Sequence, residues 1–345
     1  MIVVRAPLRV SFLGGGTDFD DFFMRYGGAV ISTAIDKYVY IIVKQRYDNL
    51  IRVSYSKQEV VETVNELEHE IIREAMKKTG IARGIEIITL ADVPSHGTGL
   101  GSSSSVCVGL LHALYAYRGE YKSPDELAQE ACRIEIDILR KPIGRQDQYI
   151  AAYGDMQFIT FSSEGIMLER IDIPDEEKHR FENNLLLFDT GLTRNSNEVL
   201  AEQVTNIDYR LDILHTMRDS ADKARELIVT GAFDDFGLLL DENWELKKQL
   251  SSLISNPEID EMYRAARQAG ALGGKITGSG GGGFLLLYCP QERIDSVRTA
   301  LGRLRELPFR FQCFGSRIVY SNSSDRVISD ANTKRGSCGF PPARE

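Results

Sequence analysis

The sequence predicts an α+β fold in two domains. Up to about residue 155, apolar β-branched runs typical of strands are mixed with segments of helical spacing. The second half is richer in helical segments and has strands of its own, without the regular βαβ alternation of a parallel sheet. The chain has 345 residues, 43% of them hydrophobic, and can therefore bury a sizeable core. We expect domains over residues 1–155 and 156–322, and a disordered polar tail over 323–345.

The first domain is expected to begin with strands. A strand over 2–13, broken at Pro7, leads into the tight turn Gly14-Gly15-Gly16-Thr17-Asp18. Apolar spacing and capping signals predict the other elements. These are strands at 29–43, 51–54 and 84–89, a helix at 60–79, an apolar helix that ends near Gly119, a helix capped by Ser123-Pro124 and ended by Pro142, and a loop at 144–148.

The second domain is expected to begin with a hairpin over 156–173, around the turn Ser163-Glu164-Gly165. A glycine-rich stretch over 270–283 lies near its end. The remaining elements are a strand at 184–189, a loop at 190–195, helices at 196–231, 233–253 and 257–269, a strand at 284–288, a helix at 291–304 and short strands within 309–320.

The stretch Pro94–Ser105, PSHGTGLGSSSS, is the first candidate for a ligand-binding loop. Its glycines let the backbone approach a ligand closely, and its serines supply hydroxyls just before an apolar helix. A glycine-rich loop that opens a helix points free N–H groups and the positive end of the helix dipole at one place, which suits phosphate. Taken alone, the stretch could equally be an ordinary Ser/Gly surface loop.

Composition excludes several classes of partner. The formal net charge of −9 and the pI near 5.3 argue against nucleic acid and anionic membranes. The N-terminal segment has arginines within its short apolar run and is neither a signal peptide nor long enough to span a bilayer. Five scattered cysteines without C-x-x-C spacing argue against a disulfide framework or a zinc site. We therefore expect a cytoplasmic protein.

Two familiar glycine motifs fail on inspection. The run Gly278–Gly283 satisfies G-x-G-x-x-G, but a strand follows it where a dinucleotide-binding fold requires a helix. The pair Gly274-Lys275 suggests a Walker loop, yet Ile276 stands where Ser or Thr should bind magnesium, and Ala269 replaces the upstream glycine.

Three motifs in order resemble the signatures of the GHMP kinase superfamily, which includes galactokinase and homoserine, mevalonate and phosphomevalonate kinases. They are Ala6-Pro7-Leu8-Arg9, then PSHGTGLGSSSS, then GGKITGSGGGG, and the resemblance covers roughly residues 1–320. It implies a two-domain fold with ATP and sugar bound in the cleft between domains. The segments APLRVSFLGGGTD, GRQDQYIAAYGD and GLTRNSNEVL are most similar to sugar-1-kinases for D-glycero-D-manno-heptose 7-phosphate, with the L-fucokinases nearby.

The resemblance implies roles for individual residues. Asp147 is the expected catalytic base, and Arg9 the cation that keeps it ionised. Mg²⁺ is expected at Ser103 and Glu135, with ATP phosphates held by the loop. The loop residues are Gly97, Gly99, Leu100, Gly101, Ser102, Ser103 and Ser104, and the expected sugar-binding residues are Gly16, Thr17, Asp18, Asp147, Arg194, Gly280 and Gly281. The second of these sets includes Arg194 for the distal phosphate of the sugar, with Arg145 and Lys141 as weaker candidates.

The implied activity is transfer of phosphate from Mg·ATP to the anomeric hydroxyl of heptose 7-phosphate, giving the 1,7-bisphosphate. Gly15-Gly16 replaces the Glu-His of galactokinase, which makes galactose an improbable substrate. Two alternatives stay open: an L-fucokinase-like or other sugar-1-kinase, and a catalytically silent homologue that senses sugar. The resemblance also leaves a homodimer open.

Overall fold

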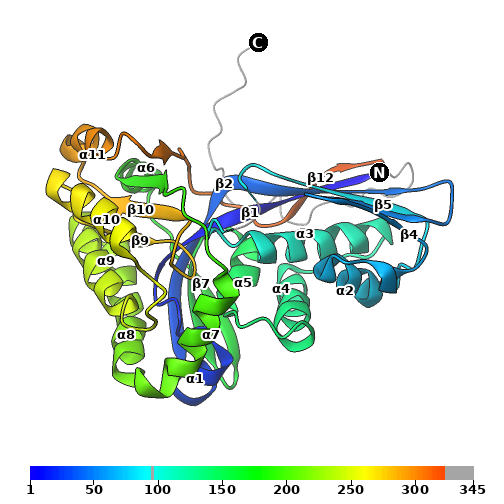
Figure 1. The fold of residues 1–345 in the computed structure, drawn as a ribbon, viewed down its shortest axis with the longest axis horizontal. Helices are drawn as coiled ribbons and strands as arrows, with labels where there is room; N and C mark the ends of the chain where they lie inside the picture. The colour runs from blue at the N-terminus through cyan, green and yellow to red at the C-terminus, as the bar shows by residue number, and fades with distance from the viewer. Residues whose placement is uncertain (95–96, 323–345) are drawn as a thin grey trace, which may run out of the picture.

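Two sheets organise the chain in the computed structural model, which describes residues 1–94 and 97–322 (Figure 1). The larger sheet has eight strands in the order β12-β1-β2-β5-β3-β4, with β6 paired to β2 and β7 to β6. Its strands are β1 (Ile2–Leu13), β2 (Gly28–Gln45), β3 (Ile51–Ser54), β4 (Gln58–Val61), β5 (Ile85–Ala91), β6 (Met156–Ser162), β7 (Gly165–Arg170) and β12 (Arg317–Ser321). The smaller sheet has the order β11 (Arg305–Glu306), β8 (Leu185–Asp189), β10 (Phe284–Tyr288) and β9 (Gly273–Ile276).

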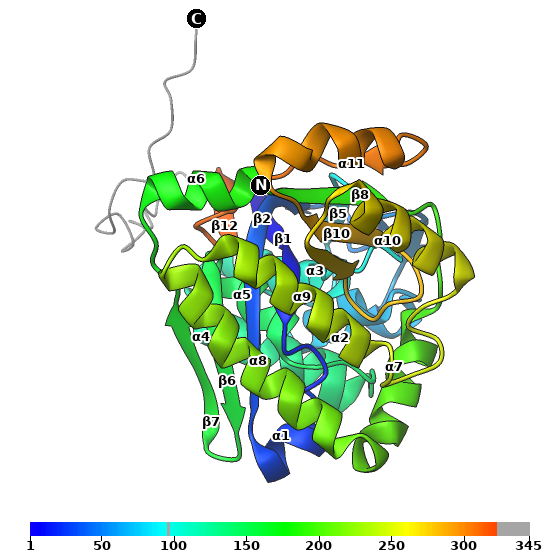
Figure 2. The same ribbon diagram turned by 90° about the vertical axis from the view of Figure 1, so that its left-hand side faces the viewer.

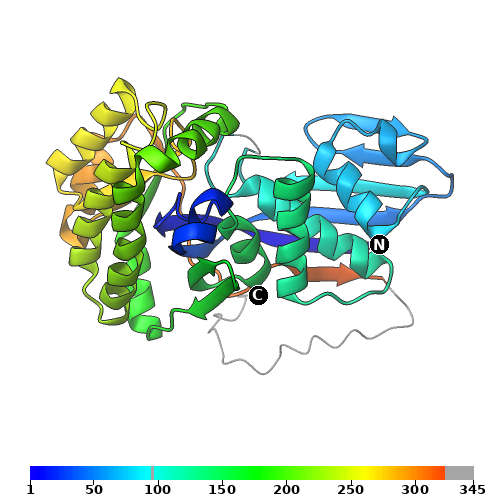
Figure 3. The same ribbon diagram turned by 90° about the horizontal axis from the view of Figure 1, so that it is seen from below.

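Helices cover both sheets. They are α1 (Asp20–Tyr26), α2 (Glu70–Thr79), α3 (Ser102–Tyr117), α4 (Pro124–Cys132), α5 (Gln146–Tyr153), α6 (Asp175–Asn183), α7 (Ser196–Asn206), α8 (Leu211–Val229), α9 (Phe233–Lys247), α10 (Pro257–Ala269) and α11 (Ile294–Ala300). Helices α2 to α5 lie below the larger sheet in Figure 1, and α8 to α11 gather at the other end of the molecule around the smaller sheet. In the view from below, α2 to α4 cover the larger sheet and α8 stands beside the end of β1 (Figure 3).

Strand β1 connects the two ends of the molecule. It packs against α3 and α5, and also against α8 and α9 from the second half of the chain (Figure 2). Every residue from Ala6 to Leu13 is consequently buried, which explains why the sequence of this strand is almost continuously apolar. The charged Arg9 lies within this buried run, so a specific partner must satisfy it.

The smaller sheet is buried on both faces. Leu187 and Leu286 belong to the hydrophobic cluster shared with the larger sheet, while Leu186 and Leu285 belong to a second cluster with α7 and α10. Successive side chains of a strand point to opposite faces, so this alternation joins two cores across one sheet. The arrangement confirms the mixed α/β content expected from the sequence. Strands β6, β7 and β12 pair within the larger sheet, and the division at residues 155 and 156 stays a prediction.

Several predicted elements differ from the structure. The helix expected over 60–79 begins only at Glu70, because His69 caps it and the preceding residues form β4 and a short 3₁₀ turn, Val64–Glu66. Pro7 does not break β1 and coincides only with an irregularity in its pairing with β2. The sequence analysis missed α6 and the glycine-rich β9.

Three further expectations concern the tail, membrane-spanning segments and the cysteines. The tail expected to be disordered, 323–345, lies outside the described residues. Within the described ranges, no helix is long and apolar enough to cross a membrane. Cys107, Cys132 and Cys289 are buried free thiols. Cys313 is disulfide-bonded, which differs from the expectation of reduced cysteines.

Candidate active site

The glycine- and serine-rich loop of the second motif, residues 97–104, is called the phosphate-type loop below. It ends in the first turn of α3. Gly101 is the N-cap residue and gives no side-chain cap, so the first N–H groups of α3 keep their hydrogen-bonding capacity for a ligand. The loop is tied to β1 because Arg9 donates its backbone N–H to the carbonyl of Leu100 at 3.0 Å. The hydroxyl of Ser102 lies 3.3 Å from that of Thr98 and is buried.

The two glycine-rich stretches pack against each other at this loop. A Cβ on Gly99 would lie 2.3 Å from the carbonyl oxygen of Thr277, and one on Gly278 would lie 2.6 Å from the Cα of Gly99. Both glycines also have φ near +70°, which side-chain-bearing residues rarely adopt. The contact needs glycine on both sides, and it brings the second and third motifs of the sequence analysis together.

Arg9 and Asp147 form a bidentate ion pair next to the loop. Arg9 Nε and Nη2 donate to the two carboxylate oxygens of Asp147 at 2.7 and 2.8 Å, and Nη1 donates to the carbonyl oxygen of Gly99. The arginine side chain is 6% exposed and the aspartate side chain 22%, so the carboxylate retains a path to the cleft. Asp147 lies in the first turn of α5 and not in a loop as expected, so a helix fixes its position.

Asp18 is a second carboxylate near Asp147. Its oxygens accept from the backbone N–H of Gly16 at 3.0 Å and from Gln146 Nε2 at 3.0 Å. Burial raises the pKa of Asp18, and the nearby negative charge of Asp147 raises it further, while these hydrogen bonds act in the opposite direction. Gly144 leaves room for it, since a Cβ there would lie 2.0 Å from Asp18 Oδ2.

Glu135 contacts the first turn of α3 from a π-helical turn, Arg133–Ile138, that continues α4. The glutamate is fully buried, and Ser103 and Ser104 donate their hydroxyls to its two oxygens at 2.6 and 2.7 Å. Gln148 Nε2 adds a third hydrogen bond at 2.9 Å. π-Helical turns often occur at functional sites because they redirect a side chain out of the regular helical spacing.

Sequence reasoning missed the functional position of two lysines. Lys141 Nζ lies 3.3 Å from Ser103 Oγ and 3.7 Å from Glu135, so it belongs with the loop serines and not with a distal sugar phosphate. Lys247, at the end of α9, reaches the same cleft and donates to the carbonyl oxygen of Gly278 at 2.6 Å. Lys247 lies on the buried face of α9 together with Leu240 and Trp244, and a lysine at a core-facing position of a helix was the available signal.

A cavity of about 80 Å³ joins these groups. Arg9, Asp18 and Asp147 line it from the N-terminal half, and Lys247, Gly278 and Ser279 from the C-terminal half. Gly16 and Gln203 also line it, whereas the metal candidates Ser103 and Glu135 do not. A carboxylate beside a cation, a second carboxylate and a phosphate-type loop can position a hydroxyl, accept its proton and hold phosphate groups, which suits phosphoryl transfer to an alcohol.

Comparison with known proteins assigns the family. The model of the GHMP kinase N-terminal domain matches residues 62–155, and that of the GHMP kinase C-terminal region matches residues 224–305. The chain belongs to the GHMP kinases. It is therefore an ATP-dependent phosphotransferase that acts on an alcohol group, as the sequence motifs predicted.

Individual relatives of this GHMP kinase carry more specific names. It is 27% identical over 334 residues to the D-glycero-alpha-D-manno-heptose 7-phosphate kinase of Campylobacter jejuni, covering 89% of this chain and 96% of that one. It is also 27% identical to the L-fucokinase/L-fucose-1-P guanylyltransferase of Bacteroides fragilis, of which it spans only 34%. The crystal structure of a D-glycero-D-manno-heptose 1-phosphate kinase from Bacteroides thetaiotaomicron superposes with a TM-score of 0.79 at 23% identity, covering 94% of this chain and 100% of that one, and this likeness confirms the fold.

The structure places several predicted sugar-binding residues of this GHMP kinase outside the cavity lining. Thr17 is fully buried, and its hydroxyl lies 2.8 Å from the carbonyl oxygen of Gly14 and 3.0 Å from that of Ala29, inside the turn. Gly280 packs against Ile254, and Gly281 packs against the side chain of Arg194. Gly278 and Ser279 form the rim instead. Arg145 pairs with Asp20 and Asp137, which fits a structural role.

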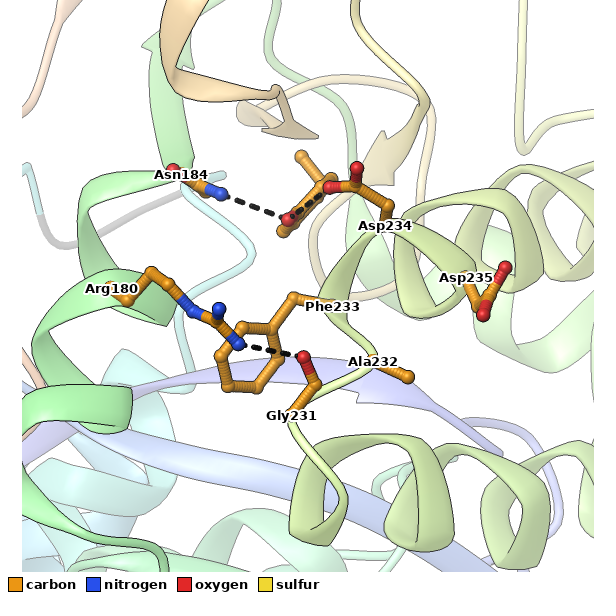
Figure 4. Close-up of a pocket in the computed structure, with 8 residues that line it drawn as sticks. Arg180, Asn184, Gly231, Ala232, Phe233, Asp234 and Asp235 are labelled. Carbon is orange, nitrogen blue, oxygen red and sulfur yellow. Dashed lines mark hydrogen bonds between the residues drawn. The ribbon is translucent and has the colours of Figure 1, made fainter.

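A larger cavity of about 310 Å³ lies elsewhere in this GHMP kinase (Figure 4). There the Tyr288 hydroxyl donates to Asp234 at 2.8 Å and accepts from Asn184 at 2.9 Å, and Arg180 lies 4.8 Å from the centre of the Phe233 ring. The polar groups named here have protein partners, and none is a predicted site residue. Size alone therefore does not locate the chemistry.

Proposed function

We propose that this GHMP kinase phosphorylates the anomeric hydroxyl of D-glycero-D-manno-heptose 7-phosphate to give the 1,7-bisphosphate. The observation that carries the proposal is the polar cavity in which Asp18 and Asp147 stand beside the phosphate-type loop. Similarity to a heptose 7-phosphate kinase over 89% of the chain supports this choice of sugar. One of the two similar heptose kinases is named for heptose 7-phosphate and the other for heptose 1-phosphate, so heptose 1-phosphate is the first competing substrate.

In the proposed reaction, the anomeric oxygen attacks the γ-phosphorus while the bond from that phosphorus to the bridging oxygen of ADP breaks. The proton of the hydroxyl passes to Asp147. Arg9 holds Asp147 in place, because its guanidinium group donates two hydrogen bonds to the carboxylate. The N–H groups from Gly97 to Ser104 bind the phosphates, and Asp18 with Gly16 orients the sugar.

Ser103 and Glu135 fit a magnesium ion. Glu135 is a buried carboxylate that accepts hydrogen bonds from neutral donors and lies 3.7 Å from Lys141, and oxygen ligands with one carboxylate suit this hard cation. Ser103 is exposed whereas Ser104 is 2% exposed, which favours Ser103 as the serine that reaches the metal. The ion, when bound, neutralises charge on the ATP phosphates. Lys141 would add a positive charge on the same side.

Glu135→Gln should raise the Mg²⁺ concentration needed for half-maximal rate, because an amide oxygen is a weaker ligand for a hard cation than a carboxylate. We expect at least the ~10- to 100-fold change that follows loss of an outer partner in a metal site. The rate is measured against free Mg²⁺ at fixed ATP. Glu70→Gln is the matched control, since Glu70 also pairs with Lys141 but lies farther out. An unchanged requirement in Glu135→Gln would return Glu135 to a structural role.

A panel of acceptors tests the proposed function directly. ATP turnover is followed with heptose 7-phosphate, heptose 1-phosphate, unphosphorylated heptose, L-fucose and galactose, and the product is identified by ³¹P NMR. The proposal requires the highest kcat/KM with heptose 7-phosphate and a new phosphate at the anomeric carbon. A preference for L-fucose would favour the fucokinase alternative, and sugar binding without turnover would favour a sensor.

We also propose a cytoplasmic location and two domains divided at residues 155 and 156, as the sequence suggests. A homodimer stays a prediction that sedimentation velocity of the purified protein can test.

A further inference from the structure

Lys247 is a buried cation that the reaction described above does not use. It is the last residue of α9 and is 4% exposed, so water screens its charge poorly. An ammonium group has three N–H donors, and in the part of the chain that the structure describes Lys247 is assigned one hydrogen bond, to Gly278. Leaving buried donors without partners is costly, which indicates that a ligand meets them.

The position of Lys247 assigns it to the acceptor and not to ATP. It lines the 80 Å³ cavity together with Asp18 and Asp147, whereas Ser103, Glu135 and Lys141 do not line it. Lys247 comes from the C-terminal half of the chain and Asp147 from the N-terminal half, and both line this cavity. An oxygen-rich ligand placed between Asp147 and α9 would therefore contact this ammonium group.

Other atoms in the same cavity also lack partners. Ser11 Oγ and Gln146 Oε1 are both buried without a hydrogen bond in the described residues, and both residues line the cavity. A Cβ placed on Gly15 would lie 3.6 Å from Ser11 Oγ and 3.6 Å from Gln146 Nε2, the amide nitrogen that donates to Asp18, so both side chains lie beside the Gly14–Asp18 turn. The Ser11 hydroxyl can donate and accept, the Gln146 amide oxygen can accept, and the Lys247 ammonium group can donate. Together around one small cavity, these groups match the hydroxyls of a sugar.

We propose that Lys247 binds the acceptor sugar through its ammonium group and determines affinity for that substrate. The proposal rests on the proposed function for the choice of sugar, and it extends the predicted site to a residue on α9. It makes Lys247 a specificity residue, with its second and third N–H groups donating to oxygens of the acceptor.

The surroundings of Lys247 add a pH dependence. Burial and, to a smaller extent, the positive charge of Arg9 lower the pKa of Lys247 to about 8, against the opposite effect of the negative charges of Asp18 and Asp147. Lys275 on β9 is the other cation facing it. The binding form is protonated below this pKa and is lost as pH rises through it. The kcat/KM for sugar should therefore fall above pH ~8 in the free enzyme.

Lys247→Met is the test, because methionine keeps the length of the apolar stem and removes the charge. We expect KM for heptose 7-phosphate to rise ~10- to 150-fold, KM for ATP to change little, and the fall in sugar kcat/KM above pH ~8 to disappear. Lys248→Met is the matched control at the C-cap of the same helix, since Lys248 pairs with Glu245 and is more exposed, and it should behave as wild type.

A second variant separates binding from a purely structural role of the Gly278 contact. In Lys247→Ala, added ethylamine should restore sugar kcat/KM, because a small amine can occupy the position of the lost ammonium group. Equal increases of KM for ATP and sugar, or an unchanged pH profile without amine rescue, would overturn the proposal. If wild type prefers another sugar, the function proposed above fails by itself, and the same comparisons are then made with that sugar.

Discussion

Asp147→Asn should lower kcat by ~10²–10⁴ while ATP and sugar still bind. Asparagine keeps the size of the side chain and one oxygen that can accept from Arg9, but it cannot take the proton of the attacking hydroxyl. The geometry strengthens this expectation, because Asp147 faces the cavity from the first turn of a helix and is held there by two hydrogen bonds. The measurement is single-turnover rate at saturating substrates, with binding constants from calorimetry.

The control for this experiment is Asp137→Asn. Asp137 is a nearby carboxylate with a 54% exposed side chain that lies 3.7 Å from Arg145, and removing its charge should leave kcat within about twofold. Near wild-type turnover in Asp147→Asn would remove Asp147 as the base. Loss of sugar binding in a folded Asp147→Asn protein would assign it a positioning role instead.

The predicted fold was most accurate where local signals and packing agree. The capping sequence at Ser123 gave the start of α4, and both its side-chain and backbone hydrogen bonds are present. The apolar run of β1 correctly gave a strand through Leu13. The prediction failed before Glu70, because the spacing of apolar residues there fits a helix although tertiary pairing makes β4. It also failed at β9, where glycines suggest a loop although β10 offers a partner strand.

Among the candidate site residues, those that belong to motifs could be predicted from the sequence, whereas Lys247 could not. Arg9, Asp147, Ser103 and Glu135 come together in the pairs that the motif resemblance implied, although 138 residues separate the first pair. Lys247 carries no motif in the sequence analysis, and only packing of α9 against the third glycine motif brings it into the cleft. Long-range packing of this kind cannot be derived from local spacing.

Arg194→Ala should raise KM for heptose 7-phosphate ~10- to 150-fold and leave KM for ATP nearly unchanged, because loss of a charge-assisted hydrogen bond weakens phosphate binding by this amount. Arg194 is exposed and precedes α7, whose N-cap residue Asn195 accepts from the N–H of Asn197 at 3.1 Å. A guanidinium group beside a helix N-terminus is a good site for a phosphate that reaches out of a small cavity.

The loop that carries Arg194 lies beside both glycine-rich stretches, which the sequence alone does not show. A Cβ on Gly281 would lie 3.0 Å from Arg194 Cδ, and one on Gly97 would lie 3.2 Å from Thr193, so the loop touches both glycine-rich stretches. Arg194 could therefore serve either the sugar phosphate or ATP, and the two KM values distinguish these roles. Arg210→Ala, at an exposed arginine between α7 and α8, is the control. Unphosphorylated heptose should be almost indifferent to Arg194→Ala, and equal losses with both sugars would show that Arg194 does not bind the distal phosphate.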